Sequence, residues 1–473
     1  MTMMSTELAT LLEMIESPAA TSADFANARL PASMQALATL RQDQEMFAGM
    51  ASEDKDPRRS LKRVEVPIPE PRSGEAIVAV MASGINFNTV WSSIFEPLST
   101  HQFLAQYAQS HPRGRMHQQD YHILGSDACG VVVRVGEGVT RWKPGDRVTV
   151  NPSVFGLIDP AGHDDPLVDP DARAWGFETN FGGLAQFCLV QESQLMAKPE
   201  HMSWEEAASL ALVSGTAYRM LVSRNGARMK QGDNVLIWGG SGGMGAVGIQ
   251  YVLNGGGRPV AVVSGPEKEA LVRELGCEMV IDRSKLRGSF IKESGELNTR
   301  QLVAFRGAVE RLLGGEEIDI VYEHTGRETF SASVFVARRG GKVVTCGSTT
   351  GYQHVYDNRY LWMHVKSIIG SHGANFREAY EANRMACLGK IHPTVSQSFP
   401  LAQAAEAVAQ VKANRHVGKL GVLCLAEREG MGIRRVTMRE GIGESRFDLF
   451  RRFQARQQEA AAQKASAAVA ATA

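Results

Sequence analysis

A glycine-rich stretch in the middle of the chain has the residue types and spacing of a dinucleotide-binding turn. Gly240, Gly242 and Gly245 follow an apolar run that starts at Asn234, and small residues at helical spacing continue to Gln250. This order predicts a strand, a tight turn and a helix. Such a turn lets backbone approach a pyrophosphate, and the helix N-terminus offers it unpaired N–H groups and partial positive charge. The candidate pyrophosphate-binding residues are Ser241, Gly242, Gly243, Met244 and Gly245.

The end of the next predicted strand indicates which dinucleotide binds. A fold that prefers NAD places Asp or Glu there, about 20 residues beyond the last glycine, to hold the ribose 2′-hydroxyl. Here the run from Pro259 ends in Ser264, so no carboxylate repels a 2′-phosphate, and Lys268 and Arg283 are near enough in sequence to receive one. Lys268 is equally well explained as a solvated charge in the first turn of a helix. The pattern predicts NADPH as the cofactor, and Ser264 carries most of that argument.

The elements that position these residues alternate between strand and helix after Thr216. Five segments fit parallel strands, namely residues 235–238, 260–264, 279–282, 318–323 and 342–346. With helices between them, they predict a doubly wound sheet, a Rossmann dinucleotide-binding domain, over residues 216–370. The predicted fold class is therefore α/β.

A β-rich domain is expected on both sides of that sheet, over residues 61–215 and 371–430. Short β-like runs at 75–81, 130–138 and 142–150 are separated by Gly and Pro. This texture resembles the GroES-like catalytic domain of the medium-chain dehydrogenase/reductase superfamily. Residues 1–60 are Ala- and Leu-rich and predict a helical N-terminal extension, and residues 431–473 predict a helical or disordered tail.

Charge and composition exclude several classes of partner. The 473 residues contain 51 Lys plus Arg and 51 Asp plus Glu, a balance that argues against a nucleic-acid-binding protein. No apolar run reaches membrane-spanning length and the N-terminus lacks a secretory signal, so we expect a cytoplasmic protein without a membrane partner. The six cysteines are scattered without a C-x-x-C pair, and we expect reduced thiols and no metal site.

Four longer motifs narrow the resemblance to one family. Zinc-dependent members of the superfamily carry G-H-E where this chain has GSDACG at 125–130, and a lobe of close cysteines that is missing here. The segments GINFNTVWSSIFEP (84–97), WGFETNFGG (175–183), YDNRYLWM (356–363) and GSHGANFREA (370–379) resemble crotonyl-CoA carboxylase/reductases, which belong to the zinc-free branch. The resemblance extends from about residue 50 to about residue 430.

The resemblance implies NADPH-dependent reductive carboxylation of an α,β-unsaturated acyl-CoA by CO2, giving an alkylmalonyl-CoA such as ethylmalonyl-CoA. In the family an Asn, a Phe-Glu pair and a His hold CO2, and these carry over to Asn88, Phe177, Glu178 and His372. The amide of Asn88 and an N–H of His372 would meet the negative charge that develops on the CO2 oxygens. Glu178 would hold a water or orient His372, and Phe177 would shield the enolate from water.

Each of these residues also has a plain structural interpretation. Asn88 fits a turn cap, Glu178 a surface carboxylate and His372 a structural histidine, and it is their joint presence in family motifs that favours catalysis. For CoA, the family suggests Arg359 and Tyr360, although Arg359 could instead pair with Asp357 or Glu323.

One departure from the family pattern lies beside the predicted acyl site. Gly373 stands where the family usually has Phe, which predicts either room for a longer enoyl-CoA or entry of water that protonates the enolate. Two rival functions therefore stay open: an enoyl-CoA reductase that does not carboxylate, and a non-enzymatic NADPH-binding protein. The resemblance also implies a homotetramer, a dimer of dimers, in which the exposed edge strand near residues 367–372 is covered.

Overall fold

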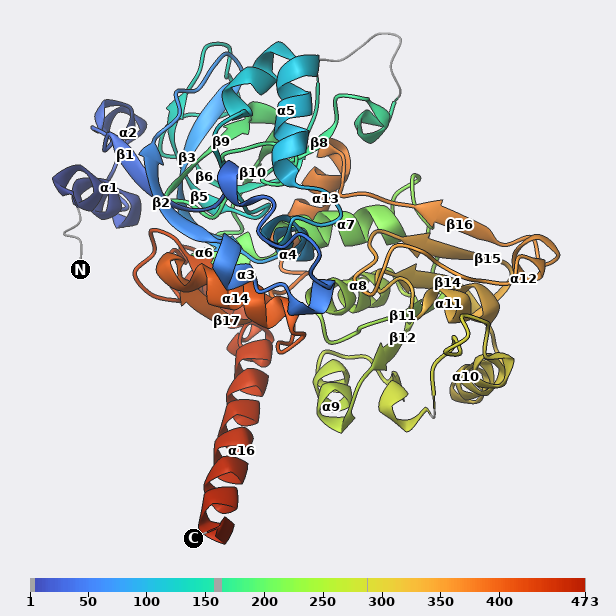
Figure 1. The fold of residues 1–473 in the computed structure, drawn as a ribbon. Coiled ribbons are helices and arrows are strands. Elements are labelled where there is room, and N and C mark those ends of the chain that lie inside the picture. The colour runs from blue at the N-terminus through green and yellow to red at the C-terminus, as the bar shows by residue number, and fades with distance from the viewer. Residues whose placement is uncertain (1–4, 157–163, 287, 473) are drawn as a thin grey trace. The chain divides into compact units, whose positions relative to one another are not determined.

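The computed structural model describes residues 5–156, 164–286 and 288–472, and its contacts divide the chain into two compact units. Unit 1 contains the residues up to Leu212 together with 375–383 and 397–444. Unit 2 contains residues 213–374, 384–396 and the segment from Ser445 onward. Figure 1 shows the course of the chain, coloured from blue to red.

Unit 2 is built on a parallel sheet of six strands. Its strands are β11 (Asn234–Ile237), β12 (Arg258–Val263), β13 (Met279–Asp282), β14 (Ile318–Glu323), β15 (Ala337–Thr345) and β16 (Ser367–Gly370). Their order is β13-β12-β11-β14-β15-β16, and all neighbours are parallel (Figure 1). The connections reverse between β11 and β14, which is the switch point of a doubly wound fold, where ligands bind beyond the carboxyl ends of the strands. The predicted Rossmann architecture is confirmed.

The helices of unit 2 lie before, between and after these strands along the chain, and those from Gly243 to Val336 contact the sheet. They are α7 (Ala211–Leu221), α8 (Gly243–Asn254), α9 (Pro266–Glu274), α10 (Thr299–Leu312), α11 (Phe330–Val336), α12 (Arg359–Trp362) and α16 (Leu449–Thr472). A buried aromatic cluster fixes one layer against the sheet: Trp238 lies 5.1 Å from Phe305 and 6.0 Å from Phe290, measured between ring centroids. The indole N–H of Trp238 donates to Ser333, so the buried polar atom is satisfied as burial requires.

Unit 1 contains the antiparallel β-rich part of the chain. Its strands are β1 (Ser33–Leu40), β2 (Lys62–Pro67), β3 (Glu75–Gly84), β4 (Tyr121–Ile123), β5 (Cys129–Val135), β6 (Arg147–Val150), β7 (Ser153–Val154), β8 (Arg173–Ala174), β9 (Phe187–Gln191), β10 (Leu195–Ala197), β17 (Val395–Pro400) and β18 (Lys419–Leu423). The main sheet runs β10-β6-β5-β3-β18-β17, with β9 also paired to β3, and a second sheet runs β2-β1-β4. Every residue of β3 is buried, so this strand is the centre of the unit.

The helices of the β-rich part are short and lie in the connections. They are α1 (Thr6–Glu16), α2 (Ser22–Asn27), α3 (Pro57–Ser60), α4 (Phe87–Ile94), α5 (Thr100–Ser110), α6 (Trp204–Ala208), α13 (Phe376–Cys387), α14 (Ala404–Lys412) and α15 (Val436–Ile442). Over both units, 3-10 helices occupy Arg41–Asp43, Ser52–Asp54, Pro112–His117, Pro166–Val168, Glu192–Gln194, Arg283–Lys285, Leu401–Gln403 and Glu444–Arg446.

The N-terminal region differs from the expectation in one respect, whereas the C-terminal segment takes the helical form, one of the two alternatives predicted for it. The prediction of a helical extension is wrong for residues 33–40, which form β1 between β2 and β4. Backbone pairing and the burial of Ala36 and Ala38 override the helix propensity of this Ala-containing stretch. At the other end α16 continues as helix to Thr472, anchored at its start by the buried side chains of Leu449, Phe450 and Phe453.

Candidate active site and nucleotide site

The glycine-rich turn in unit 2 has the geometry of a pyrophosphate site. Strand β11 ends at Ile237 and α8 begins at Gly243, with Gly242 at its N-cap. Gly239 has φ +58°, and a side chain at Gly245 would overlap the carbonyl oxygen of Gly239. The first hydrogen bond of the helix runs from the Ala246 N–H to the Gly242 carbonyl. The N–H groups of Gly243, Met244 and Gly245 come before it and make no hydrogen bond within the helix, so they can bind an anion.

Two of the three residues predicted for a 2′-phosphate lie together at the end of β12. Ser264 follows the strand directly, and Lys268 in α9 reaches its hydroxyl with an Nζ–Oγ distance of 3.4 Å. Burial lowers the pKa of Lys268, because the ammonium is partly removed from water. A 2′-phosphate would compensate that loss of hydration.

Arg283 is engaged elsewhere. Its guanidinium pairs with Glu328 at 2.8 Å, and the two side chains are 41% and 51% exposed. Asp282, at the end of β13, instead accepts hydrogen bonds from the Gly265 and Ser284 N–H groups and shapes the turn after β12. The assignment of Arg283 to the 2′-phosphate stays a prediction, and binding there would compete with its pairing to Glu328.

In unit 1, Asn88 lies in the first turn of α4, and its side-chain amide is held by Ser126. Asn88 Nδ2 donates to Ser126 Oγ at 2.7 Å, and the Ser126 hydroxyl donates to the carbonyl of Trp175 at 2.6 Å. Asn88 Oδ1 is buried, and it has no hydrogen-bond partner among the residues that the structure describes. A buried amide oxygen left unpaired is costly, and such groups concentrate at functional sites.

Phe177 and Glu178 lie on the turn that follows Trp175. Glu178 Oε2 accepts from Ala174 N–H at 2.7 Å, while the Phe177 ring packs against Phe103 at 5.7 Å between centroids. Gly176 has φ +69°, and a side chain there would overlap the carbonyl oxygen of Gly125. The turn therefore packs closely against the segment that carries Ser126. Through Ser126, which bonds both Asn88 and the Trp175 carbonyl, Asn88 is linked to the turn that carries Phe177 and Glu178.

A buried ion pair supports the entry into α4. Lys419 Nζ contacts Asp127 Oδ2 at 2.9 Å, Asn86 Oδ1 at 2.5 Å and the carbonyl of Ile85 at 2.7 Å. Both charged side chains are at most 5% exposed. Burial lowers the pKa of Lys419, and the carboxylate of Asp127 opposes that shift. This network fixes the backbone two residues before Asn88.

Buried histidines support the turn that carries Phe177 and Glu178. A ring nitrogen of His122 lies 3.2 Å from the carbonyl of Thr179, and His117 Nδ1 accepts from Asn180 N–H at 3.1 Å. Burial lowers the pKa of His117 to about 4 and that of His122 to about 3. Burial lowers the pKa of His101, whose ring lies 6.1 Å from that of His122, to about 4. These rings are held neutral, and their role is structural support.

The fourth predicted CO2 residue, His372, belongs to unit 2. It lies two residues after the end of β16 and is exposed within the chain, while the N–H of the intervening Ser371 donates to the carbonyl of Thr345. Gly373 has φ +53°, a left-handed conformation that favours glycine. The position of His372 relative to the three residues of unit 1 stays a prediction.

Arg359 forms an ion pair with Asp357, which is the structural alternative to a CoA contact that the sequence analysis left open. Its guanidinium makes a bidentate pair with Asp357, with a shortest distance of 2.6 Å, and its side chain is 74% exposed. Tyr360 packs its ring against Phe335, with centroids 4.8 Å apart. The assignment of these two residues to CoA stays a prediction.

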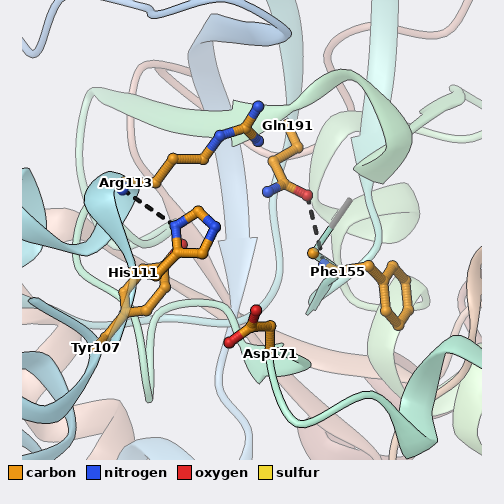
Figure 2. A pocket seen from close by; sticks show the side chains of 7 residues that line it. Tyr107, His111, Arg113, Phe155, Asp171 and Gln191 are labelled. Atoms are coloured by element: carbon orange, nitrogen blue, oxygen red, sulfur yellow. Dashed lines mark hydrogen bonds between the residues drawn. The ribbon is translucent and has the colours of Figure 1, made fainter. Parts of the chain in front are cut away.

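The lining of a pocket in unit 1 includes none of the predicted catalytic residues. Figure 2 shows its lining, which is Tyr107, His111, Arg113, Phe155, Gly156, Asp171 and Gln191. His111 and Gln191 each accept a backbone N–H, from Arg113 and Phe155. Over the described ranges, no group of three or more His, Cys, Asp or Glu side chains is placed to hold a metal ion. In the same ranges no helix is long and apolar enough to cross a membrane.

The supporting residues were missed by the sequence reasoning. Ser126 and Asp127 stand in the segment where zinc-dependent members of the superfamily carry G-H-E, and that replacement was the available signal. Lys419 and the buried histidines left no signal, because their partners lie 292 residues (Lys419 and Asp127) and 57 residues (His122 and Thr179) away along the chain.

Comparison with known proteins agrees with this architecture. Residues 72–200 match the model of the alcohol dehydrogenase GroES-like domain, and residues 243–387 match that of zinc-binding dehydrogenases. A crotonyl-CoA reductase of Streptomyces collinus is 54% identical over 91% of this chain and 96% of its own length. A crotonyl-CoA carboxylase/reductase of Cereibacter sphaeroides is 37% identical over 82% of this chain and 89% of its own.

A solved structure extends the comparison to the fold as a whole. The structure of a 2-octenoyl-CoA carboxylase reductase in complex with NADP and 2-octenoyl-CoA superposes with a TM-score of 0.89 at 50% identity, covering 94% of this chain and 99% of that one. The family predicted from the sequence and its GroES-like and Rossmann fold are confirmed. This chain belongs to the crotonyl-CoA carboxylase/reductase family of the medium-chain dehydrogenase/reductase superfamily.

Proposed function

We propose that this chain catalyses the NADPH-dependent reductive carboxylation of a 2-enoyl-CoA to an alkylmalonyl-CoA. The observation that carries the proposal is the Asn88 side chain, which Ser126 holds by one N–H while its second N–H and its buried Oδ1 stay available for a ligand. When bound, NADPH supplies the hydride that reduces the β-carbon. The glycine-rich turn would hold its pyrophosphate, and Ser264 with Lys268 its 2′-phosphate.

The residues of unit 1 act after the reduction. The electron pair of the C=C bond moves onto the thioester as an enolate, whose α-carbon then bonds to the carbon of CO2, and one C=O bond of CO2 becomes the C–O⁻ of the product carboxylate. Negative charge therefore develops on the CO2 oxygens, where the free N–H of Asn88 can stabilise it. Phe177 would exclude the water that would otherwise protonate the enolate.

Glu178 has a positioning role in this proposal. Because its Oε2 already accepts the Ala174 N–H, the carboxylate is fixed in direction, and Oε1 can order a water or the His372 ring. His372 completes the site in the family, and we retain it as the second donor to the CO2 oxygens.

The acyl preference follows from Gly373. The relative solved with 2-octenoyl-CoA is named for that substrate. The family resemblance implies that Gly373 stands where other members usually carry Phe, and a glycine there would leave more room for the acyl chain. We propose that a medium-length chain such as 2-octenoyl-CoA is preferred over crotonyl-CoA. The alternative is that the same volume admits water, so that the enolate is protonated and the chain acts as an enoyl-CoA reductase.

Steady-state kinetics separate these alternatives. Purified protein with NADPH is given crotonyl-CoA or 2-octenoyl-CoA, with and without bicarbonate, and the products are weighed by mass spectrometry. We expect products heavier by one carboxyl group when bicarbonate is present and a higher kcat/KM for 2-octenoyl-CoA. Saturated acyl-CoA at a rate indifferent to bicarbonate would support the reductase, and no NADPH oxidation with either substrate would support the non-enzymatic alternative.

Assembly and location complete the proposal. Strand β16 pairs with β15 on one side, and both Ser367 and Gly370 are exposed within the chain, as an uncovered edge requires. Together with the family resemblance, this supports a homotetramer built as a dimer of dimers. A cytoplasmic location, expected from the sequence, stays a prediction.

A further inference from the structure

Ser126 joins the two segments of unit 1 that carry the predicted CO2 residues. Its side chain is buried, with 1% of the residue exposed, between β4 and β5. Asn88 reaches it from α4, and the carbonyl of Trp175 reaches it from the start of the turn that contains Phe177 and Glu178. One hydroxyl thus touches both parts of the site.

The directions of the two hydrogen bonds are fixed by elementary chemistry. A hydroxyl has one hydrogen, and the Trp175 carbonyl can only accept, so the Ser126 hydrogen points to Trp175. Ser126 Oγ then has only lone pairs to offer Asn88, so the amide must turn its NH2 toward Ser126. A flipped amide would place Oδ1 against those lone pairs, and the bond would be replaced by repulsion.

The fixed orientation decides what Asn88 offers to a ligand. With one Nδ2 hydrogen on Ser126, the second N–H and the buried, unpaired Oδ1 keep defined positions. If the amide rotated freely, its oxygen would spend part of the time where an N–H is needed. An acceptor there would repel the negative charge that develops on CO2, and carboxylation would slow while hydride transfer would not.

We propose that Ser126 is a positioning residue for carboxylation, which locks the amide of Asn88 through the Trp175 carbonyl and couples α4 to the turn at Phe177 and Glu178. This inference rests on the proposed function. The inference gives a functional role to Ser126, which stands in the segment where zinc-dependent members of the superfamily carry a histidine.

The test compares Ser126→Ala with a matched buried serine. Ser83 is fully buried, and its hydroxyl donates to the carbonyl of Asp127 at 2.7 Å, so Ser83→Ala removes a similar bond without touching Asn88. The product ratio, carboxylated to protonated, is measured at limiting bicarbonate, together with NADPH oxidation at saturating enoyl-CoA. Ser126→Ala should lower the ratio about tenfold, which corresponds to about 1.4 kcal/mol, and change NADPH oxidation less than about twofold. Ser83→Ala should leave the ratio unchanged.

Two further variants keep the inference falsifiable. Ser126→Thr retains the hydroxyl and should keep most of the wild-type ratio of carboxylated to protonated product. This variant tests the role of the hydroxyl even if Ser126→Ala folds poorly. In the double variant Ser126→Ala/Asn88→Ala the ratio should equal that of Asn88→Ala alone, because Ser126 acts through Asn88. Additive losses, or equal ratios in Ser126→Ala and Ser83→Ala, would overturn the inference. A wild-type product ratio indifferent to bicarbonate would instead overturn the proposed function, so the two failures are distinguishable.

Discussion

Replacement of Lys268 by alanine should shift the cofactor preference of the enzyme, while replacement of Arg283 should not. Lys268 Nζ lies 3.4 Å from Ser264 Oγ at the end of β12, and its ammonium is partly removed from water. A charge-assisted hydrogen bond to a phosphate contributes about 1.5–3 kcal/mol, so Lys268→Ala should lower kcat/KM for NADPH about 10- to 150-fold. The value for NADH should change little, because NADH has no 2′-phosphate.

Arg283 supplies the matched control for this experiment. Its guanidinium pairs with Glu328, and both side chains are more than a third exposed, so the cation is already neutralised and screened by solvent. We expect Arg283→Ala to change kcat/KM for NADPH less than about fivefold, the scale of a surface pair of up to about 1 kcal/mol. The assay is initial-rate kinetics with both cofactors at fixed enoyl-CoA. Equal losses with NADPH and NADH in Lys268→Ala, or a larger NADPH loss in Arg283→Ala, would refute the assignment.

Three other perturbations test the supports and the acyl site. His101, His117 and His122 have folded pKa values of about 4, 4 and 3 against 6.5, so the unfolded state binds more protons below pH 6.5. Their contribution to stability is present above pH 6.5, and the free energy of unfolding should fall by about 3 kcal/mol between pH 6.5 and 5.5. Urea unfolding at the two pH values measures this fall, and an unchanged free energy of unfolding would contradict the expectation. Lys419→Met leaves Asp127 buried without its cation and should cost about 3–5 kcal/mol in the same assay, whereas a loss below about 1 kcal/mol would argue against the network. Gly373→Phe should lower kcat/KM for 2-octenoyl-CoA more than for crotonyl-CoA, and an equal effect on both would show that Gly373 does not face the acyl chain.

The parallel sheet could be predicted because its determinants are local. Strands β11, β12 and β13 contain short apolar runs at 235–237, 259–263 and 279–281, and the turn after β11 is set by glycines that lie within a few residues of one another. Ser264 and Lys268 were likewise found together because they are four residues apart, at the end of a strand and the start of a helix.

The sequence does not show interactions with residues that lie far away along the chain. Residues 33–40 have the composition of a helix, but pairing with β2 and β4 makes them a strand. Arg283 is claimed by Glu328, 45 residues away, and Asn88 by Ser126, 38 residues away. A resemblance identified Asn88 and Glu178 as site residues, but only the folded chain shows which of their atoms are already hydrogen-bonded and which remain for a ligand.

The central claim is that the enolate takes CO2 and not a proton, and one isotope experiment tests it directly. The protein is incubated with NADPH, 2-octenoyl-CoA and 13C-bicarbonate in D2O, and the substituent on the α-carbon of the product is identified by mass spectrometry. The proposed function predicts a 13C-carboxyl group on the α-carbon. A deuterium on that carbon, with no 13C in the product, would contradict it.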